Sequence, residues 1–240
     1  PELATNALNA LAKIKDISAG PQLVDLLNSA NRNVKQTAAV TVGILRTRSA
    51  VPKLQSIFQS DSNNQDREAA LDGLAYIGDP ASYHLFVEAL SSAYQDDRAY
   101  AAEGLARVGN KQALPALQEA MQVENKQNAR LAILFAESAL GETQRLEDLV
   151  NALPSRSYGD VAQSYLIELT RRKNLLDAVY PYLTNANAVI RRKLCYVLMY
   201  SGNASSIQHL EPLAHDHNGD VAAAALSAIK SIRSRTNSAA

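Results

Sequence analysis

The sequence predicts an all-α protein, an α-solenoid in which about seven helix pairs are followed by a single terminal helix. Three observations lead to this prediction. The stretch "LAYIGDPASYHLFVEAL" (74–90) returns 31 residues later as "LARVGNKQALPALQEAM" (105–121). Apolar residues recur three and four positions apart, which is the period of one helix face. No alternating run of β-branched residues with hairpin turns is present, so strands are not predicted.

The repeat can be followed along the chain from one reference position, called here the anchor, which is Arg67 in the third copy. Successive anchors are 29 to 32 residues apart, a period typical of repeat architectures. The eight anchors are Ala4, Lys35, Arg67, Arg98, Arg130, Ala162, Arg191 and Ala222. Positions three, four and seven after the anchor are mostly apolar, as at Ala70, Leu71 and Leu74, and predict a helix A in each copy. Glu137 breaks the pattern at position seven.

A second apolar pattern, sixteen and nineteen residues after the anchor, predicts a helix B, as at Tyr83 and Phe86. Turns that contain glycine, such as 78–80 and Gly109, separate the two helices, because glycine tolerates the left-handed conformation of a helix C-cap. The last copy has only a helix A, near residues 219–233. Because no linker interrupts the pattern, the sequence predicts a single repeat domain over 1–240. Since the pattern already begins at Ala4, we expect this domain to be part of a longer protein.

The third and fourth copies, "DREAALDGLAYIGDPAS" and "DRAYAAEGLARVGNKQALPAL", resemble the short HEAT-like repeats named after the phycobilisome bilin lyases (PBS lyases). Hallmarks of that repeat are an Arg near the start of helix A, small residues after it, and a Leu-x-x-Ile/Val-Gly-Asp/Asn turn. The resemblance implies a superhelix of HEAT-like pairs, with helices A on the convex side and helices B on the concave side, where partners bind.

Candidate partner-binding residues follow from that implication and from the tyrosines. The chain has ten Tyr, three Phe and no Trp, and Tyr is enriched at protein interfaces. The candidates are helix-B positions outside the apolar stripe, together with two tyrosines that flank Pro181. They are His84, Val87, Glu88, Gln118, Glu119, Gln122, Tyr180, Tyr182, Gln208 and Glu211.

Composition and charge bear on several classes of function. The 24 basic and 24 acidic residues balance, whereas nucleic-acid and membrane-surface binders normally carry a basic excess. No apolar run is long enough for a transmembrane helix. Cys195 is the single cysteine, so no internal disulfide framework exists. The compartment is not predicted.

Candidate chemistry gives few signals. The basic anchors predict a structural ladder of ion pairs between repeats, since the Arg fork satisfies several acceptors. Residues 215–217, "HDH", lack the further His or Cys that would complete a metal site. Cys195 falls on the apolar stripe and is predicted to be a buried thiol. No nucleophile, phosphate-loop or metalloprotease motif is present. We therefore predict no catalytic residue, no cofactor and no metal.

Three hypotheses about function remain. The first is a non-catalytic scaffold that binds a protein or peptide partner on the concave helix-B face. The second rests on the resemblance alone and is a bilin-lyase-like protein that handles a tetrapyrrole. The third is a nucleic-acid-binding solenoid that uses the triplets "RRK" at 171–173 and 191–193. The charge balance and the lack of interleaved aromatic residues argue against this third hypothesis.

Overall fold

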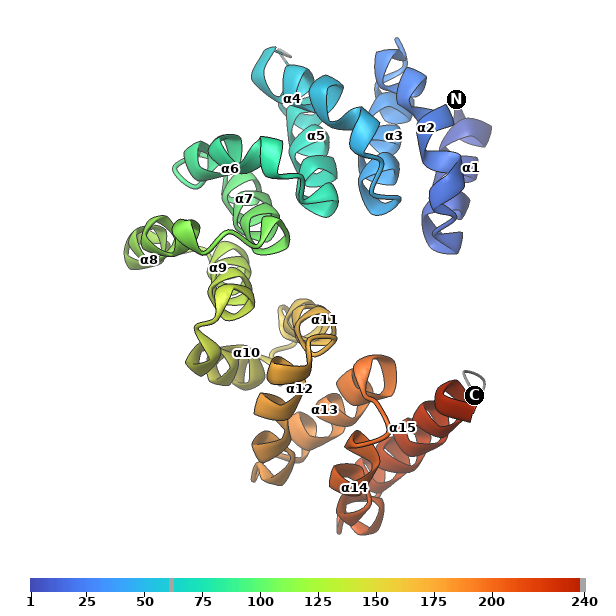
Figure 1. Cartoon of the computed structure of the whole chain (residues 1–240), viewed down its shortest axis with the longest axis vertical. Coiled ribbons are helices and arrows are strands. Elements are labelled where there is room, and N and C mark those ends of the chain that lie inside the picture. Colours follow the sequence, from blue (N-terminus) through green and yellow to red (C-terminus); the bar gives the residue numbers. More distant parts are fainter. Residues whose placement is uncertain (61–62, 238–240) are drawn as a thin grey trace. The chain divides into compact units, whose positions relative to one another are not determined.

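The computed structural model of the chain describes residues 1–60 and 63–237. Its helices follow the predicted order, seven pairs of helix A and helix B and then one more helix A, labelled α1 to α15 in Figure 1. Odd-numbered helices are helices A and even-numbered helices are helices B. The prediction of an all-α solenoid of about seven pairs plus a terminal helix is therefore confirmed. Contacts divide the chain into two compact units, residues 1–136 and 137–240.

Unit 1 contains four complete pairs and the first part of a fifth helix A. Its helices are α1 (Glu2–Ile14), α2 (Gly20–Leu23), α3 (Arg32–Ile44), α4 (Val51–Ser60), α5 (Asn64–Ile77), α6 (Tyr83–Ala89), α7 (Gln95–Val108), α8 (Leu114–Val123) and α9 (Gln127–Leu140), which continues into unit 2. A short 3₁₀ turn leads into helix B in each pair, as Pro80–Ser82 leads into α6.

The core of unit 1 consists of the predicted apolar stripe. Ala70, Leu71 and Leu74 on α5 have no exposed surface, and neither does Phe86 on α6. Successive helices A pack directly against each other, α1 on α3, α3 on α5 and α5 on α7. Small residues permit this approach, because a Cβ at Gly73 would lie 2.4 Å from the carbonyl oxygen of Ala39 on the preceding helix A. Burial is thus shared between neighbouring repeats, as expected for a solenoid.

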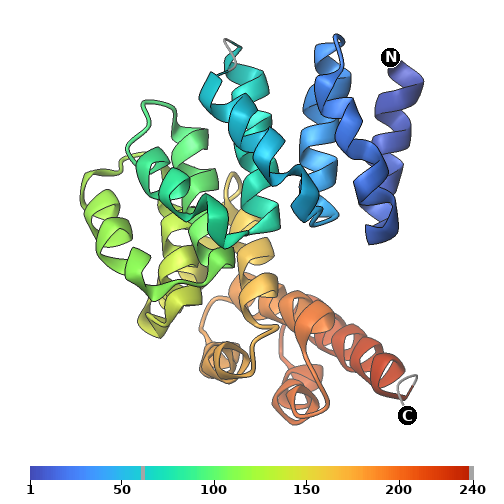
Figure 2. The same ribbon diagram turned by 45° about the horizontal axis from the view of Figure 1, so that its top comes forward.

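The layers of unit 1 do not have the sides that the resemblance implied. Within this unit α3, α5 and α7 lie on the inner side of the bend, and α4, α6 and α8 lie on its outer side (Figures 1 and 2). The inner layer of a bend brings its helices closest together. The direct contacts between successive helices A agree with this arrangement. The prediction that helices B line the concave side is therefore wrong in unit 1, where the concave side consists of helices A.

Two turns have the glycine conformation that the sequence predicts. Gly78 and Gly109 are left-handed, with φ of 63° and 76°, and each closes its helix A by donating to a carbonyl one turn earlier, Leu74 and Leu105 respectively. Gly202 differs, because its backbone is extended, with φ of −65°. A Cβ there would lie 2.6 Å from the carbonyl oxygen of Leu198, so this glycine is required for close approach of the backbone.

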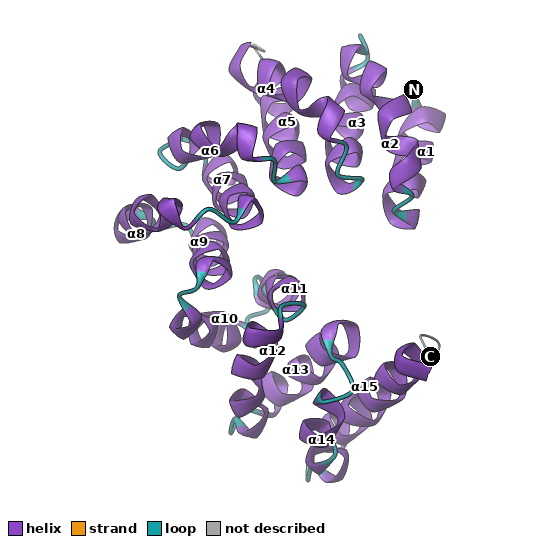
Figure 3. Ribbon diagram, in the orientation of Figure 1, coloured by secondary structure: helices purple, strands orange, loops and turns teal. Residues whose placement is uncertain are grey.

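Unit 2 repeats the arrangement, with helices B of five to seven residues. After the end of α9 its helices are α10 (Leu146–Ala152), α11 (Gly159–Leu169), α12 (Lys173–Val179), α13 (Ala188–Ser201), α14 (Ser206–Leu210) and α15 (Gly219–Asn237). Helices α11, α13 and α15 again pack directly against one another. Figure 3 shows only helices and loops in the part of the chain that the structure describes. Whether the two units act as one domain over 1–240 stays a prediction.

Candidate partner-binding surface

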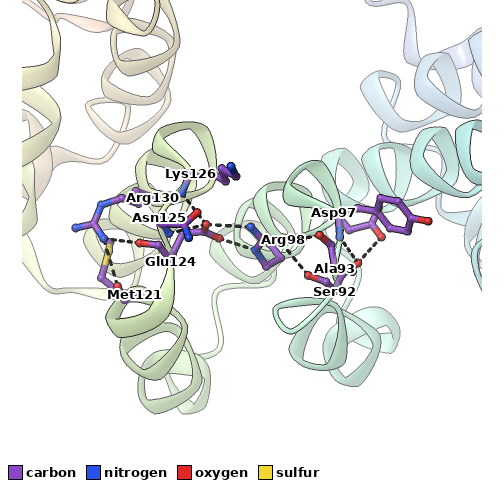
Figure 4. Close-up of polar contacts among 10 residues, drawn as sticks. Ser92, Ala93, Asp97, Arg98, Met121, Glu124, Asn125, Lys126 and Arg130 are labelled. Atoms are coloured by element: carbon purple, nitrogen blue, oxygen red, sulfur yellow. Dashed lines mark hydrogen bonds and ion pairs between the residues drawn. The ribbon is translucent and has the colours of Figure 1, made fainter.

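Four of the five basic anchors contact a neighbouring repeat through hydrogen bonds or an ion pair, and Arg98 on α7 is the clearest case (Figure 4). Its Nε and Nη2 donate to the two carboxylate oxygens of Glu124, at 2.6 and 2.9 Å. Its Nη1 donates to the carbonyl oxygens of Ser92 and Ala93, at 2.8 and 3.2 Å. The guanidinium therefore ties the loop after α6 to the loop after α8. Hydrogen bonds from Arg98 also lower the pKa of Glu124.

Arg191 on α13 repeats this arrangement in unit 2. It donates from Nε and Nη2 to Asp216, at 2.8 and 2.9 Å, and from Nη1 to two loop carbonyl oxygens, at 2.8 and 3.0 Å. These hydrogen bonds lower the pKa of Asp216 to about 2. Asp216 belongs to the segment "HDH", and the described residues contain no group of His, Cys, Asp and Glu that could hold a metal ion. Arg98 and Arg191 thus have the structural role predicted for the anchors.

The acidic partners of the anchors do not all occupy the same position of the repeat. Lys35 does contact Asp66, with Nζ 2.5 Å from Oδ2. Asp97, however, accepts from the hydroxyl of Ser92 at 2.8 Å, while the neighbouring Arg98 pairs with Glu124. The signal that could have found this partner is an acidic residue in the next loop from helix B to helix A, 26 residues after Arg98 and 25 residues after Arg191.

The candidate residues of unit 1 lie on α6 and α8, on the outer side of the bend. His84, Glu88, Gln118, Glu119 and Gln122 are exposed, and Val87 is half-buried. His84 also meets the ring of Tyr83 edge-on, with ring centroids 5.2 Å apart. Their exposure leaves them free to contact a partner, which stays a prediction.

The candidate residues of unit 2 are more involved in packing. The ring of Tyr180 stacks on His209 at a centroid distance of 3.8 Å, and its hydroxyl lies 2.9 Å from the hydroxyl of the buried Ser206. Both contacts fasten the end of α12 to α14. Tyr182 is half-buried, and burial raises its pKa. Gln208 and Glu211 are exposed on and just after α14.

A polar surface that the sequence did not single out lies on the inner helices α5 and α7. We call it the α5–α7 surface, and its residues are all half-buried. Those on α5 are spaced four apart and so lie on one face, and those on α7 occupy the matching face. The members are Glu68, Asp72, Tyr76, Asp96, Tyr100, Glu103 and Arg107.

Asp72 is the most perturbed carboxyl group of this surface. Burial raises its pKa to about 7, and the charges of Glu103 and Glu68 add to the rise, while Arg107 opposes it. Asp72 forms no hydrogen bond or ion pair within the described residues. Burial and the nearby carboxylates also raise the pKa of Tyr100. The surface therefore holds acidic groups that are incompletely solvated and short of cationic partners.

Arg107 is the single basic residue of the α5–α7 surface, and its contacts are already made. Its Nη1 lies 3.0 Å from a carboxylate oxygen of Glu103 and donates to the carbonyl oxygen of Ala75 at 3.3 Å. The guanidinium also lies over the ring of Tyr76, at 4.9 Å from the centroid. Four carboxyl groups thus face one bound guanidinium. Beside this surface, the helices α1, α3 and α5 enclose a groove of about 290 Å³ whose lining includes Val40 and Ile44.

The two "RRK" triplets do not form a free basic patch. Arg191, Arg192 and Lys193 all contact carboxylates, and Arg192 does so at 3.5 Å from Asp220. Arg172 donates to the carbonyl oxygen of Ala139. Local partners thus account for most of this positive charge, and the absence of a nucleic-acid partner stays a prediction. None of the helices in the described part of the chain has the length and apolar character needed to cross a membrane.

Cys195 is buried in α13, and burial raises the pKa of its thiol to about 12. A thiol with so high a pKa holds its proton at neutral pH and is a poor nucleophile. The prediction of a core thiol agrees with this burial.

Comparison with known proteins supports the repeat fold. A family model described as HEAT repeats matches residues 1–82 and 83–170. None of the curated proteins matches the chain. The complex of CpcE and CpcF of phycocyanin lyase from Nostoc sp. PCC7120 is similar in structure, with a TM-score of 0.63 and 20% identity, over 96% of this chain and 89% of that chain. Human deoxyhypusine hydroxylase in complex with glycerol has a TM-score of 0.39 and 17% identity, over 95% and 89% of the two chains. A designed armadillo repeat protein has a TM-score of 0.33 and 17% identity, over 88% and 99%.

Proposed function

Because the chain belongs to the HEAT-repeat family, we propose that it is a non-catalytic scaffold that binds a protein or peptide partner. The observation that carries this proposal is the α5–α7 surface on the inner side of unit 1. Helical repeats use extended surfaces of this kind to bind partners. The surface lies on helices held by a hydrogen-bonded ladder, so little order has to be imposed on binding.

Asp72 gives this surface a preference for cationic groups. A carboxylate that is partly removed from water and lacks a hydrogen-bond donor is destabilised in its charged form. A Lys or Arg side chain from a partner would supply the missing counter-charge, and Glu68 and Glu103 would add to the attraction. The rings of Tyr76 and Tyr100 would contribute apolar area beside it. The proposed partner therefore presents a basic segment to unit 1.

The exposed helix-B candidates belong to the same proposal as a second contact surface. In unit 1 they would bind a partner that reaches the outer side of the bend. In unit 2 the exposed Gln208 and Glu211 are better placed for this than Tyr180, whose ring and hydroxyl already pack against α14. Similarity to one structure of a two-protein complex is consistent with a protein partner.

The test is capture of partners by three forms of the chain, followed by cross-linking to map the contacts. We expect the unmodified chain to retain a partner, and the double variant Asp72→Asn, Glu103→Gln to lose it. The control is Ser56→Ala, Gln59→Ala, at two exposed positions of the outer helix α4 that belong to neither surface, which should retain it. A correctly folded chain that captures no partner and acts on a small molecule would overturn the proposal.

A second candidate function is the handling of a tetrapyrrole, and one specific observation favours it. Asp72 changes its proton state near neutral pH beside two tyrosines, and a carboxylate of this kind can accept hydrogen bonds from pyrrole N–H groups. The fold similarity to phycocyanin lyase is compatible with this, although at 20% identity it concerns the fold alone. Adding free bilin to the purified chain, with and without a candidate acceptor protein, should then change the visible absorbance spectrum. An unchanged spectrum in both cases would exclude this function.

A further inference from the structure

The inner side of unit 1 changes from apolar to acidic over one repeat. Positions five and nine after the anchor are four residues apart, so they lie on one face of each helix A. On α3 these positions hold Val40 and Ile44, and on α5 they hold Asp72 and Tyr76. All four residues are half-buried, and α3 packs beside α5 in the inner layer (Figures 1 and 2). Two neighbouring helices A thus present different chemistry at the same positions of the repeat.

The apolar part is a groove of about 290 Å³ between α1, α3 and α5, which we call the α3 groove. Ala12, Val40, Ile44 and Ala69 supply its apolar surface. Asn, Gln and Thr side chains complete the described lining, which holds no charged group. Ligand sites usually have volumes of about 300 to 1,000 Å³, so this groove suits one large apolar side chain rather than a whole small molecule. A charged group placed in it would lose water without gaining a counter-charge.

The groove borders directly on the acidic residues of the α5–α7 surface. Ala69, which lines the groove, follows Glu68 and lies three residues before Asp72 on α5. Residues three apart are neighbours on the surface of a helix. A molecule whose side chain fills the groove therefore has Asp72 and Glu68 within reach of its next positions.

The packing of the helices sets the spacing between the two sites. Helices that pack against each other have axes about 8 to 10 Å apart, and an extended chain advances about 3.3 to 3.6 Å per residue. Moving from one helix A to the next thus takes about three residues of an extended segment. An α-helix advances only about 1.5 Å per residue, so a helical segment would need about six residues for the same distance. An extended segment is also thinner than a helix, and it can follow the inner side of a bend closely.

We propose that unit 1 recognises an extended peptide segment in which a large apolar residue and a Lys or Arg lie about three positions apart. The apolar side chain fills the α3 groove, and the cation lies beside Asp72, Glu68 and Glu103. The partner of the proposed function, on which this proposal rests, is thereby narrowed from any basic segment to one with an apolar residue at a fixed distance. A polybasic segment leaves the groove empty, and an apolar segment leaves Asp72 without a counter-charge, so only the combination satisfies both sites.

Selection of peptides from a random phage-displayed library on the purified 240-residue chain tests the proposal. We expect the retained peptides to share a Lys or Arg about three positions from a Leu, Ile, Met or Phe. Basic residues enriched without an apolar residue at that distance would overturn this proposal and leave the proposed basic partner standing. Enrichment of neither kind of residue would overturn both. An apolar residue about six positions from the basic one would contradict the extended conformation.

Fluorescence anisotropy with the most enriched peptide, labelled with fluorescein, then locates the apolar contact. The groove variant Val40→Thr, Ile44→Thr replaces apolar groups by hydroxyl groups, and we expect it to raise the dissociation constant about tenfold. Replacing the apolar residue of the peptide by Ser should raise it to a similar degree, and the two changes together should add little more. Effects that add independently would overturn the placement of this side chain in the groove.

Asp72→Asn provides the corresponding test at the acidic site. It should weaken binding of the unmodified peptide and have little further effect on a peptide whose Lys or Arg is replaced by Ser. Ser56→Ala, Gln59→Ala, at exposed positions of the outer helix α4, should bind like the unmodified chain. Circular dichroism checks that each variant folds, and the peptide substitutions test both sites without any change to the protein. Unchanged binding by Asp72→Asn would overturn the proposed cation site.

Discussion

In unit 1 the buried carboxylate of Glu124 pairs with Arg98, and hydrogen bonds satisfy both of its oxygens. In unit 2 the buried carboxylate of Glu137 lies beside Arg145, but its oxygens are not satisfied in this way. Glu124 accepts two hydrogen bonds from Arg98 and two from backbone N–H groups, of Asn125 and Lys126. Glu137 has no exposed surface, and Nε of Arg145 lies 2.9 Å from its Oε2. The contact is close but poorly directed, and by geometry neither oxygen of Glu137 accepts a well-formed hydrogen bond within the described residues.

The difference teaches that hydrogen bonds, more than proximity of charge, decide whether a buried carboxylate is tolerated. The hydrogen bond from Arg98 dominates at Glu124 and lowers its pKa. Burial dominates at Glu137 and raises its pKa, and the charge and the close contact of Arg145 only partly oppose this. Removal from water costs free energy that Coulombic attraction alone does not offset. Asp72 belongs with Glu137 in this comparison, since burial dominates there too.

Breaking the pair of Arg98 and Glu124 should lower the free energy of unfolding more than any other change described here. In Arg98→Met, Glu124 remains buried and loses its two side-chain donors, and two loop carbonyl oxygens lose theirs. We expect the free energy of unfolding to fall by about 3 kcal/mol. Urea denaturation followed by circular dichroism measures this. Arg171→Met is the control, because Arg171 is exposed and forms no ion pair in the described chain, and a similar loss there would contradict the explanation.

Removing the charge of Asp72 should stabilise the protein only where that charge exists. The pKa of Asp72 is raised from 3.8 to about 7 in the folded state. The contribution of Asp72 to stability therefore falls as the pH rises from about 4 to about 7, and it is constant above that. We expect Asp72→Asn to raise the free energy of unfolding by about 2 kcal/mol at pH 8 and to have little effect at pH 4. Denaturation at both pH values tests this, with the exposed Asp177→Asn as control. An equal effect at both pH values would count against the assigned cause.

Replacing Glu137 by Leu should convert the incomplete pair into the apolar contact found in most other repeats. Leu occupies this position in five of the eight helices A. An apolar residue of similar volume removes the cost of a buried carboxylate, and we expect stabilisation by about 1 to 2 kcal/mol at pH 7. The midpoint of thermal or urea unfolding reports this. Glu119→Leu, at an exposed site on α8, should change stability little, and a destabilised Glu137→Leu would show that Arg145 does more than the geometry indicates.

Removing the neutral hydrogen bond between Tyr180 and Ser206 should have the smallest effect on stability. Tyr180→Phe removes a hydroxyl that lies 2.9 Å from the hydroxyl of Ser206 and keeps the ring on His209. We expect a loss of about 1 kcal/mol. Tyr182→Phe is the matched control, and its hydroxyl has no hydrogen-bond partner in the described chain, so the change should be smaller. Equal losses in the two variants would show that the Tyr180 hydroxyl contributes little.

The helical repeat was predictable from the sequence because it depends on local patterns. Apolar spacing fixes the helix faces, as at Leu71 and Leu74, and left-handed glycine fixes a turn, as at Gly78. The existence of a ladder of ion pairs was predictable, because an Arg that recurs at the anchor position of each repeat needs hydrogen-bond acceptors. Its partners were only partly predictable, because Glu124 reaches Arg98 through a loop whose path the sequence pattern does not describe.

The candidate surface was harder to predict than the fold. Glu68, Asp72 and Glu103 look like ordinary solvated helix positions in the sequence, and they matter only because α5 and α7 pack side by side. The resemblance implied that helices B form the concave side, and this expectation was wrong in unit 1. The side toward which stacked repeats bend depends on the relative bulk of the two layers of helices. Small residues such as Gly43 and Gly73 let helices A approach closely, and this summed effect is not visible in any single repeat.

The ladder also has a mechanical consequence. The bonds from Arg98 to Glu124 and from Arg191 to Asp216 join residues nearly one repeat apart, 26 and 25 positions along the chain. Because the main contacts of a repeat in the described chain are with its neighbours, we expect tension on the ends of a unit to detach one helix pair at a time. Each detached pair of about 31 residues would release about 100 Å of chain. We therefore expect a unit built in this way to extend in steps under load.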